Sequence, residues 1–306
     1  MNIYYHPEYN ISLGIFNFLH PFDGTKFSKV YKKIWNLEGI QIKQPHKPVS
    51  REAINGFVDV LVKELILNKR YILRALEIPY IPLLPFSVID KRILLPMRWG
   101  VSGTLEATRD ALLQGNMCWN MSGGYHHARR SASEGFCIYN DVGITVQELE
   151  KQGLITDKSR LLIVDIDAHH GNGNAYTFMD DDRVTILDIY NGDIYPHNPH
   201  PKSRININIP LYRGVSGEVY LNKLSEGLDE IHSEFDLAFV VAGTDVIMTD
   251  PLGGMHLTID ECVTRDKMVF DKLKSLSVPT VFLGGGGYSN DSATAITESI
   301  SALYQR

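Results

Sequence analysis

Several features that would mark other classes of protein are missing from this chain of 306 residues. The only cysteines, Cys118, Cys137 and Cys262, lie far apart without CxxC spacing, which argues against a disulfide framework or a thiolate zinc site and favours a reducing compartment. There is no run of 18 apolar residues, and the N-terminus has no signal-peptide pattern. We therefore expect a soluble intracellular protein, cytoplasmic or, in a eukaryotic cell, nuclear, with no membrane partner.

An excess of basic charge is also missing. The chain has 30 Lys and Arg against 36 Asp and Glu, a formal net charge of −6. Non-specific binding of nucleic acid depends on clustered Lys and Arg, so no direct nucleic-acid binding is expected. If the partner is chromatin or another basic protein tail, the positive charge belongs to that substrate.

No internal repeat, low-complexity tract or flexible linker divides the sequence, so we expect one domain over residues 1–306. Short apolar runs predict buried strands at 117–121, 161–166, 184–189, 237–242 and 278–283. Helical patterns lie between them at 105–113, 141–152, 217–233 and after a capping box at 258–261. Strands alternating with helices predict an α/β fold, in which helices cover both faces of a parallel sheet.

The first hundred residues are less regular. The spacing of apolar residues predicts one helix over 50–73. Residues 77–96 are rich in proline and aliphatic residues, and we expect them to cover the sheet or to form a rim loop.

Polar residues directly follow the apolar runs, at the edge where open parallel sheets bind ligands. The strongest group is Asp165, Asp167 and His169, which the alternation of strand side chains places on one face. Carboxylates and imidazoles bind catalytic zinc, which keeps three protein ligands and an open position. A helix-capping cluster in a tight turn is the alternative, but three ligand-type residues at period two favour a metal.

A third ligand is expected from the end of another strand. Asp245 is the best candidate, and Asp250 and Asp188 are competitors. A helix-capping role for Asp245 is equally compatible with the sequence.

Two further motifs have the composition of a catalytic site. His126 and His127 follow a glycine pair and suit proton transfer near neutral pH, although two surface histidines in a glycine loop are the simpler interpretation. Tyr288 follows four glycines, and no Lys-Ser/Thr pair follows them, so the motif is not a phosphate-binding loop. The glycines can form a hinge, or they can present Tyr288 beside a metal, where its hydroxyl would stabilise an oxyanion.

Taken together, the segments 126–128, 135–137, 165–173 and 284–288 resemble the metal-dependent histone deacetylases. The resemblance implies the arginase/deacetylase fold, a single α/β domain around an eight-stranded parallel sheet. The segments 20–23, 178–181 with 183–184, 188–191 with 194–196, and 243–245 with 252–254 resemble class IV members in particular.

The resemblance implies a zinc-dependent lysine deacylase that hydrolyses the amide of N-epsilon-acyl-lysine, acetyl or longer, on proteins such as histones. One zinc ion would be bound by Asp167, His169 and Asp245. His127 would be the general base, and His126, paired with Asp165, would give electrostatic support. Tyr288 would donate a hydrogen bond to the scissile carbonyl.

Further positions follow from the same resemblance. The lysine stem would pass through a tunnel lined by Gly135, Phe136, Tyr195 and Gly286. Structural potassium is expected at two sites, one around Asp165, Asp167, His169, Asp188 and Ile189, the other near Phe178, Asp181 and Val184.

One residue departs from the commoner deacetylases. Asn172 stands where many members carry the Asp that partners the base histidine, and class IV members share the Asn. A neutral amide orients the His127 ring but stabilises the imidazolium less than a carboxylate does, so we expect His127 to be more readily neutral at pH 7.

Three other functions compete with this interpretation. A small-molecule amidohydrolase acting on acetylpolyamines would share the fold. An arginase-like two-metal hydrolase would need further carboxylates, and Asp250 is the only obvious one. A silent module that only binds acyl-lysine would not need the complete catalytic set that the sequence contains.

Overall fold

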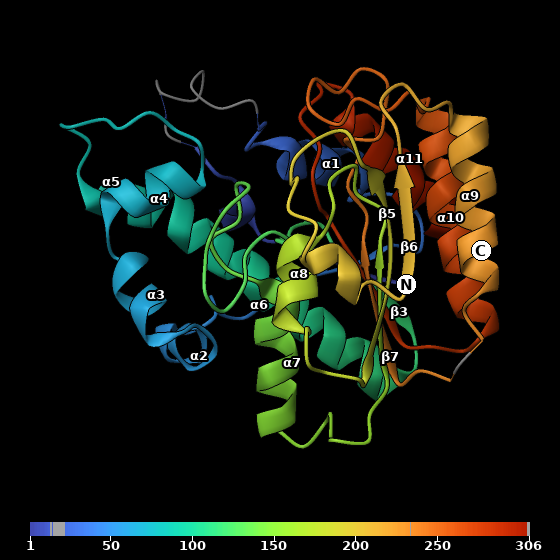
Figure 1. Ribbon diagram of the computed structural model, residues 1–306, viewed down its shortest axis with the longest axis horizontal. Coiled ribbons are helices and arrows are strands. Elements are labelled where there is room, and N and C mark those ends of the chain that lie inside the picture. Colours follow the sequence, from blue (N-terminus) through green and yellow to red (C-terminus); the bar gives the residue numbers. More distant parts are fainter. Residues whose placement is uncertain (13, 15–21, 233, 305–306) are drawn as a thin grey trace.

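The computed structural model describes the chain apart from residues 13, 15–21, 233 and 305–306 (Figure 1). His20 and Pro21, part of the class IV resemblance, and Ser233, at the end of the predicted helix 217–233, lie outside the described residues.

An eight-stranded sheet runs through the molecule in the order β2-β1-β3-β8-β7-β4-β5-β6, and each pairing is parallel. The strands are β1 (Asn2–Tyr4), β2 (Gln41–Lys43), β3 (Met117–Asn120), β4 (Leu161–Asp165), β5 (Val184–Asn191), β6 (Ile207–Leu211), β7 (Leu237–Val241) and β8 (Thr280–Leu283). The predicted single α/β domain with an eight-stranded parallel sheet is confirmed.

Helices cover both faces of this sheet (Figure 1). One layer holds α6 (Leu95–Gln114), α7 (Asp141–Lys151) and α8 (Asn172–Thr177); the other holds α1 (Lys26–Ile34), α9 (Gly217–Asp229), α10 (Ile259–Ser275) and α11 (Ser292–Tyr304). Successive β4 residues serve the two layers in turn: Leu162 and Val164 join the core under α9 to α11, whereas Leu161 and Ile163 join the core under α6 and α7. Burial on both faces explains why these strands read as continuous apolar runs.

Beyond α6 lies a smaller helical group with its own apolar core, seen at the left of Figure 1. It contains α2 (Arg51–Phe57), α3 (Val60–Leu65), α4 (Lys69–Ala75) and α5 (Phe86–Ile89), and a π-helical turn (Asp90–Leu94) leads from α5 into α6.

The prediction of one helix over 50–73 is wrong, because this segment forms α2, α3 and α4. Val58 ends α2 in an extended conformation, with ψ 151°. Asn68 then begins α4 as a side-chain cap that accepts from the backbone N–H groups of Arg70 and Tyr71.

Three strands were not predicted from the sequence. β1 and β2 have three residues each and leave too short a pattern to recognise. β6 includes Pro210, which lacks an N–H donor and is tolerated because β6 is an edge strand. β1 pairs with β2 on one side and with β3 on the other, so the N-terminal residues complete the same sheet.

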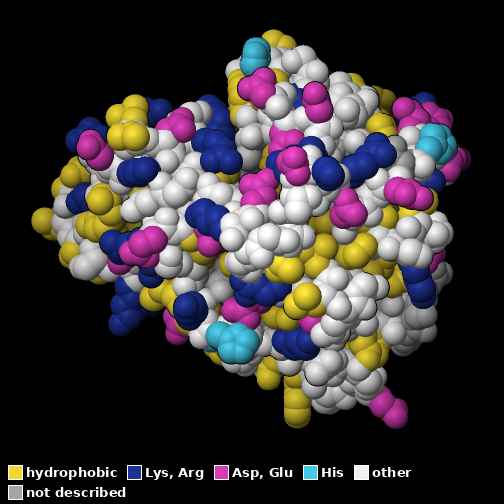
Figure 2. Space-filling view, turned by 90° about the horizontal axis from the view of Figure 1, so that it is seen from below, with side chains coloured by type: hydrophobic (Ala, Val, Ile, Leu, Met, Phe, Trp, Pro, Cys, Tyr) yellow, Lys and Arg dark blue, Asp and Glu magenta, His cyan; other side chains and the backbone are white. Residues whose placement is uncertain are grey.

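The surface carries charges of both signs. Figure 2 shows basic and acidic side chains interspersed over the face that it presents. No helix in the described part of the chain has the length and apolar character needed to cross a membrane.

Candidate active site

The site forms where the carboxyl ends of β3, β8, β7 and β4 lie level. Asn120 and Val241 both pair with Leu283, and Asp165 pairs with Val241. The loops that follow these four strands therefore meet at one edge of the sheet, as expected for an open parallel sheet.

Asp167, His169 and Asp245 meet there as a buried group that could bind a metal, with one ligand atom of each within 4.8 Å of the others. Backbone N–H groups orient both carboxylates: Ala168 donates to Asp245 Oδ1 at 2.9 Å, and Gly286 donates to Asp167 Oδ2 at 2.7 Å. The next helix after Asp245 in the described chain is α10, which Thr258 caps, so Asp245 is not a helix cap. β4 ends at Asp165, so Asp167 and His169 lie in the following loop and not on one face of the strand.

The electrostatics of this group favour a bound cation. Burial, together with the carboxylate of Asp167, raises the pKa of Asp245. Burial alone would lower the pKa of His169, but its bonds to Asp167 and Asp245 raise it to about 10. Two adjacent buried carboxylates need a positive charge beside them, which either the imidazolium of His169 or a cation bound to neutral His169 can supply.

The competing carboxylates stand apart from this group. Asp250 accepts from the backbone N–H groups of Leu252, Gly253, Tyr288 and Ser289, and thereby holds the loop that carries Tyr288. Asp188 accepts from His170 Nδ1 at 2.6 Å and from the backbone of Gly171 at 3.0 Å.

His126 and His127 are both buried, so the interpretation as surface histidines is wrong. His126 Nδ1 lies 2.8 Å from Asp165 Oδ2, and His127 Nδ1 lies 2.7 Å from Asn172 Oδ1. Burial opposes charge on His126, yet Asp165 and Asp167 raise its pKa to about 9. Burial and the neighbouring His126 and His169 hold the pKa of His127 well below 6.5. A charged and a neutral imidazole side by side have different chemical roles.

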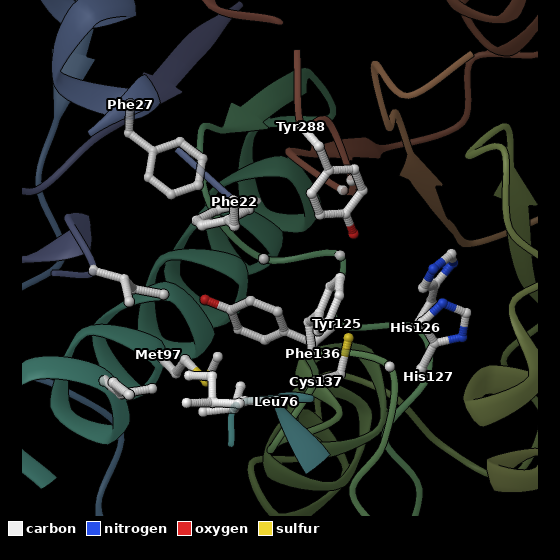
Figure 3. Close-up of a pocket in the computed structure, with 18 residues that line it drawn as sticks. Phe22, Phe27, Leu76, Met97, Tyr125, His126, His127, Phe136, Cys137 and Tyr288 are labelled. Carbon is white, nitrogen blue, oxygen red and sulfur yellow. The ribbon is translucent and has the colours of Figure 1, made fainter. Parts of the chain in front are cut away.

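Tyr288 closes the site opposite the histidines. Figure 3 shows its hydroxyl on the side of the ring that faces the two imidazoles. Its ring packs edge-on against Phe136, with centroids 5.6 Å apart, and against His169 at 6.4 Å. Burial and the carboxylates of Asp245 and Asp167 raise its pKa well above 10, so the phenol stays protonated and can donate.

Two cavities meet at this centre. The outer one, of about 480 Å³, is an open mouth whose rim includes Glu77, Asp193, Tyr195 and Leu252. The inner one, of about 90 Å³, is mostly apolar, and Figure 3 shows the side chains around it. Its apolar lining includes Ile11, Phe22, Phe27, Leu76, Ile78, Ile93 and Met97.

The predicted tunnel residues divide between the two cavities. Gly135 and Phe136 line both, whereas Tyr195 lines only the outer one and Gly286 only the inner one. The sequence did not indicate the inner cavity, because much of its lining comes from the irregular N-terminal hundred residues.

The two expected potassium sites differ. At the first, Asp165 and Asp188 are register partners on β4 and β5, and Asp188 Oδ1 is buried without a hydrogen-bond donor among the described residues, which suits a cation. At the second, Arg204 donates to the carbonyl oxygens of Phe178, Asp181 and Val184 at 2.6, 2.9 and 2.6 Å. A guanidinium binds these oxygens in the structure, and the second potassium site stays a prediction.

Two residues near the site were not found from the sequence. Lys26 on α1 is fully buried and donates to the carbonyls of Gly285 and Gly286 at 3.2 and 3.1 Å. Glu134 accepts from Asn172 Nδ2 at 2.7 Å. Both act through contacts with segments distant in the chain, which leave no local pattern.

Buried metal-ligand residues, two histidines of opposed pKa and a protonated phenol at the carboxyl edge of a parallel sheet are typical of a hydrolase. A family model, the histone deacetylase domain, matches residues 82–303. The chain therefore belongs to the histone deacetylase family, which supports amide hydrolysis as its chemistry.

Individual relatives agree with this assignment. "Histone deacetylase 2" of Arabidopsis thaliana is 33% identical over 313 residues, covering 99% of this chain and 78% of that protein. "Histone deacetylase B" of Dictyostelium discoideum is 33% identical over 184 residues, covering 56% of this chain and 41% of that protein. The crystal structure of acetylpolyamine aminohydrolase from Burkholderia pseudomallei has a TM-score of 0.76 at 18% identity, covering 99% of this chain and 98% of that one, and supports the fold.

Proposed function

We propose that this protein is a zinc-dependent lysine deacylase, similar to class IV histone deacetylases, whose single catalytic domain spans residues 1–306. The observation that carries the proposal is one arrangement: a buried Asp-His-Asp group, a neutral histidine and a protonated tyrosine surround the floor of an open mouth. The buried free cysteines fit a reducing, intracellular compartment.

The residues present fit a zinc ion. Asp167, His169 and Asp245 offer two carboxylate oxygens and one imidazole nitrogen, and backbone N–H groups already orient both carboxylates. When bound, zinc supplies a Lewis acid that polarises the amide carbonyl and acidifies water. A potassium ion at the first site, around Asp165 and Asp188, would stabilise the loop after β4 that carries Asp167 and His169.

His127 is the proposed general base. Its Nδ1 faces Asn172, so Nε2 is the nitrogen available to the reaction. His127 takes a proton from the attacking water as the new carbon–oxygen bond forms. It then gives this proton to the lysine nitrogen as the carbon–nitrogen bond breaks, which releases a carboxylate and a free lysine side chain.

Two further groups stabilise charge. His126, held charged by Asp165, lies beside His127 with ring centroids 4.1 Å apart and contributes positive potential. The Tyr288 hydroxyl donates a hydrogen bond to the carbonyl oxygen, whose negative charge grows as water adds.

The two cavities suggest how an acyl-lysine would lie. A protein-borne lysine would enter from the outer mouth past Tyr195 and run along Gly135 and Phe136, which line both cavities. The acyl group would then point toward the inner cavity, whose apolar lining suits a chain longer than acetyl.

The test is a panel of lysine peptides that carry acyl groups from acetyl to myristoyl, with product measured by mass spectrometry, with and without a chelator. We expect hydrolysis that the chelator abolishes, with kcat/KM rising for longer acyl groups. Absence of turnover on every peptide by the zinc-loaded protein would refute the proposal and favour a silent binding module.

One observation favours a second candidate, a small-molecule amidohydrolase acting on acetylpolyamines. The outer mouth carries the carboxylates of Glu77 and Asp193, which would attract the free ammonium of a polyamine. Adding acetylated diamines and polyamines to the same panel separates the two functions, because this candidate requires higher kcat/KM on the amines than on the peptides.

A further inference from the structure

A chain of hydrogen bonds leads from His127 toward the surface. His127 Nδ1 lies 2.7 Å from Asn172 Oδ1, and Asn172 Nδ2 donates to Glu134 Oε1 at 2.7 Å. The same Glu134 oxygen accepts from Arg129. Asn172 is buried, whereas the Glu134 side chain is 34% exposed, so the chain connects the site to its rim.

This connection decides which way the Asn172 amide faces. A carboxylate only accepts hydrogen bonds, so the NH₂ end of the amide must face Glu134 and the oxygen end must face His127. An amide oxygen accepts, so Nδ1 of His127 must carry the proton and Nε2 must be left with a free lone pair. Without the carboxylate, the amide can turn over, present its NH₂ group to Nδ1 and favour the other tautomer.

The local backbone keeps Glu134 in reach of Asn172. Gly135 has φ +56°, and a Cβ at this position would overlap the His127 ring, so the segment runs directly against the histidine. Arg129, which pairs with Glu134, lies over the ring of Tyr176 on α8, 4.5 Å from its centroid. Asn172 begins the same helix. Both ends of the Glu134–Asn172 bond are thus fixed to α8.

We propose that Glu134 is a positioning residue, which acts through Asn172 to keep His127 in the tautomer that has its proton on Nδ1. This inference rests on the proposed role of His127 as general base. In this chain an Asn–Glu pair therefore orients the base. A single carboxylate in place of Asn172 would do so without a partner.

A purely structural role makes a different prediction. If Glu134 served only as the ion-pair partner of Arg129, its replacement would change stability and leave the state of His127 unaltered. Partly exposed ion pairs contribute at most about 1 kcal/mol, so that change would be small.

The first test compares Glu134→Leu with Glu134→Gln. We expect kcat to fall on the order of 10-fold in Glu134→Leu with KM within about twofold, since an unsuitable tautomer removes proton transfer and not binding. Glu134→Gln retains an oxygen that can accept from Asn172, and should restore most of kcat. Glu148→Leu is the matched control, because Glu148 also pairs with a basic residue, Lys151, and this pair on α7 is outside the hydrogen-bond chain that leads to His127.

The second test repeats Glu134→Leu in an Asn172→Asp background. A carboxylate at 172 accepts through either oxygen and needs no orienting partner, and Glu134 then faces a like charge. We expect Glu134→Leu to leave kcat unchanged or to raise it in this background. An equal loss in both backgrounds would overturn the proposal.

The third test does not depend on activity. Nitrogen-15 spectra of the histidine rings report which nitrogen carries the proton. We expect the proton of His127 on Nδ1 in the wild-type protein and a mixture of tautomers in Glu134→Leu. If the protein hydrolyses no amide, the proposed function fails while these spectra still test Glu134; identical spectra in the two proteins would refute the role of Glu134.

Discussion

His126 and His127 are adjacent in the chain, yet their pKa values are shifted in opposite directions. His126 faces the carboxylate of Asp165, which keeps its pKa near 9, whereas His127 faces the amide of Asn172 and has a pKa well below 6.5. At His126 the carboxylates of Asp165 and Asp167 outweigh the effect of burial, whereas at His127 burial and the neighbouring His126 and His169 outweigh the hydrogen bond to Asn172. The neutral imidazole of His127 is the better proton acceptor at pH 7.

The first prediction concerns Asn172→Asp. A carboxylate in place of the amide favours the imidazolium, so the pKa of His127 should rise. Because the base works only when neutral, activity should then be lost at a higher pH as the pH falls. The acid limb of the profile of kcat/KM against pH should move up by about one unit. An acid limb at the same pH in both proteins would contradict this account of His127.

The second prediction concerns Tyr288→Phe. Removing one donor to a developing oxyanion costs on the order of 10² to 10³ in kcat. The ring packing against Phe136 and His169 is retained, so the metal content and the melting temperature should stay close to those of the wild type. A loss of less than about 10-fold would show that this hydroxyl does not bind the carbonyl.

The metal-ligand group, the histidine pair and Tyr288 could be predicted because each directly follows a recognisable apolar strand. Among the described residues, the structure groups Asp245, and not Asp250 or Asp188, with Asp167 and His169. Glu134 and Lys26 could not be found in this way. Their partners lie 38 and about 260 positions away in the sequence, and only the folded chain brings them together.

At the scale of elements, helix α1 and the glycine loop after β8 form one unit. Lys26 on α1 is buried, and its ammonium donates to the carbonyl oxygens of Gly285, Gly286 and Gly287. It also lies over the rings of Phe22 and Phe27, 4.8 and 5.4 Å from their centroids. The charge is maintained at neutral pH, although burial lowers the pKa of Lys26 to about 8. Helix α1, in the layer that also holds α9, α10 and α11, thus anchors the loop that presents Tyr288.

The third prediction is that Lys26→Met destabilises the protein. The substitution keeps the apolar stem but leaves loop carbonyls without a donor, which should cost about 2 kcal/mol of unfolding free energy. Denaturant unfolding measures this loss. Lys29→Met is the matched control: Lys29 lies on the same helix in an exposed ion pair with Asp23, so its loss should cost under about 1 kcal/mol. Equal stabilities of the two variants would contradict the anchoring role of Lys26.

Some strands and helices can be predicted from the sequence pattern, and others cannot. Strands buried on both faces, such as β4 and β7, are recognised from their apolar runs. β1 and β2 are too short for any periodicity to appear. The segment 50–73 has helical spacing throughout, but the cap at Asn68 and the extended residue Val58 break it into separate helices. Apolar periodicity does not record such interruptions.

At the scale of the whole molecule, the family model matches residues 82–303, yet the site is completed by residues before position 82. Ile11, Phe22, Phe27, Leu76 and Ile78 line the inner cavity, and Glu77 lies on the rim of the outer mouth. The candidate metal-binding group, His126, His127 and Tyr288 therefore lie within the part that matches the family model, while much of the inner cavity's lining comes from the N-terminal part.

The candidate metal-binding group connects all three scales, because its residues follow β4 and β7, and His127 and Tyr288 lie beside it. The most direct measurement is zinc content per chain by elemental analysis, together with acyl-lysine hydrolysis, after chelation and after zinc is returned. We predict one zinc ion per chain, activity that disappears and returns with it, and little of either in Asp245→Asn. Full turnover by the metal-free protein, or by Asp245→Asn, would contradict the proposed mechanism.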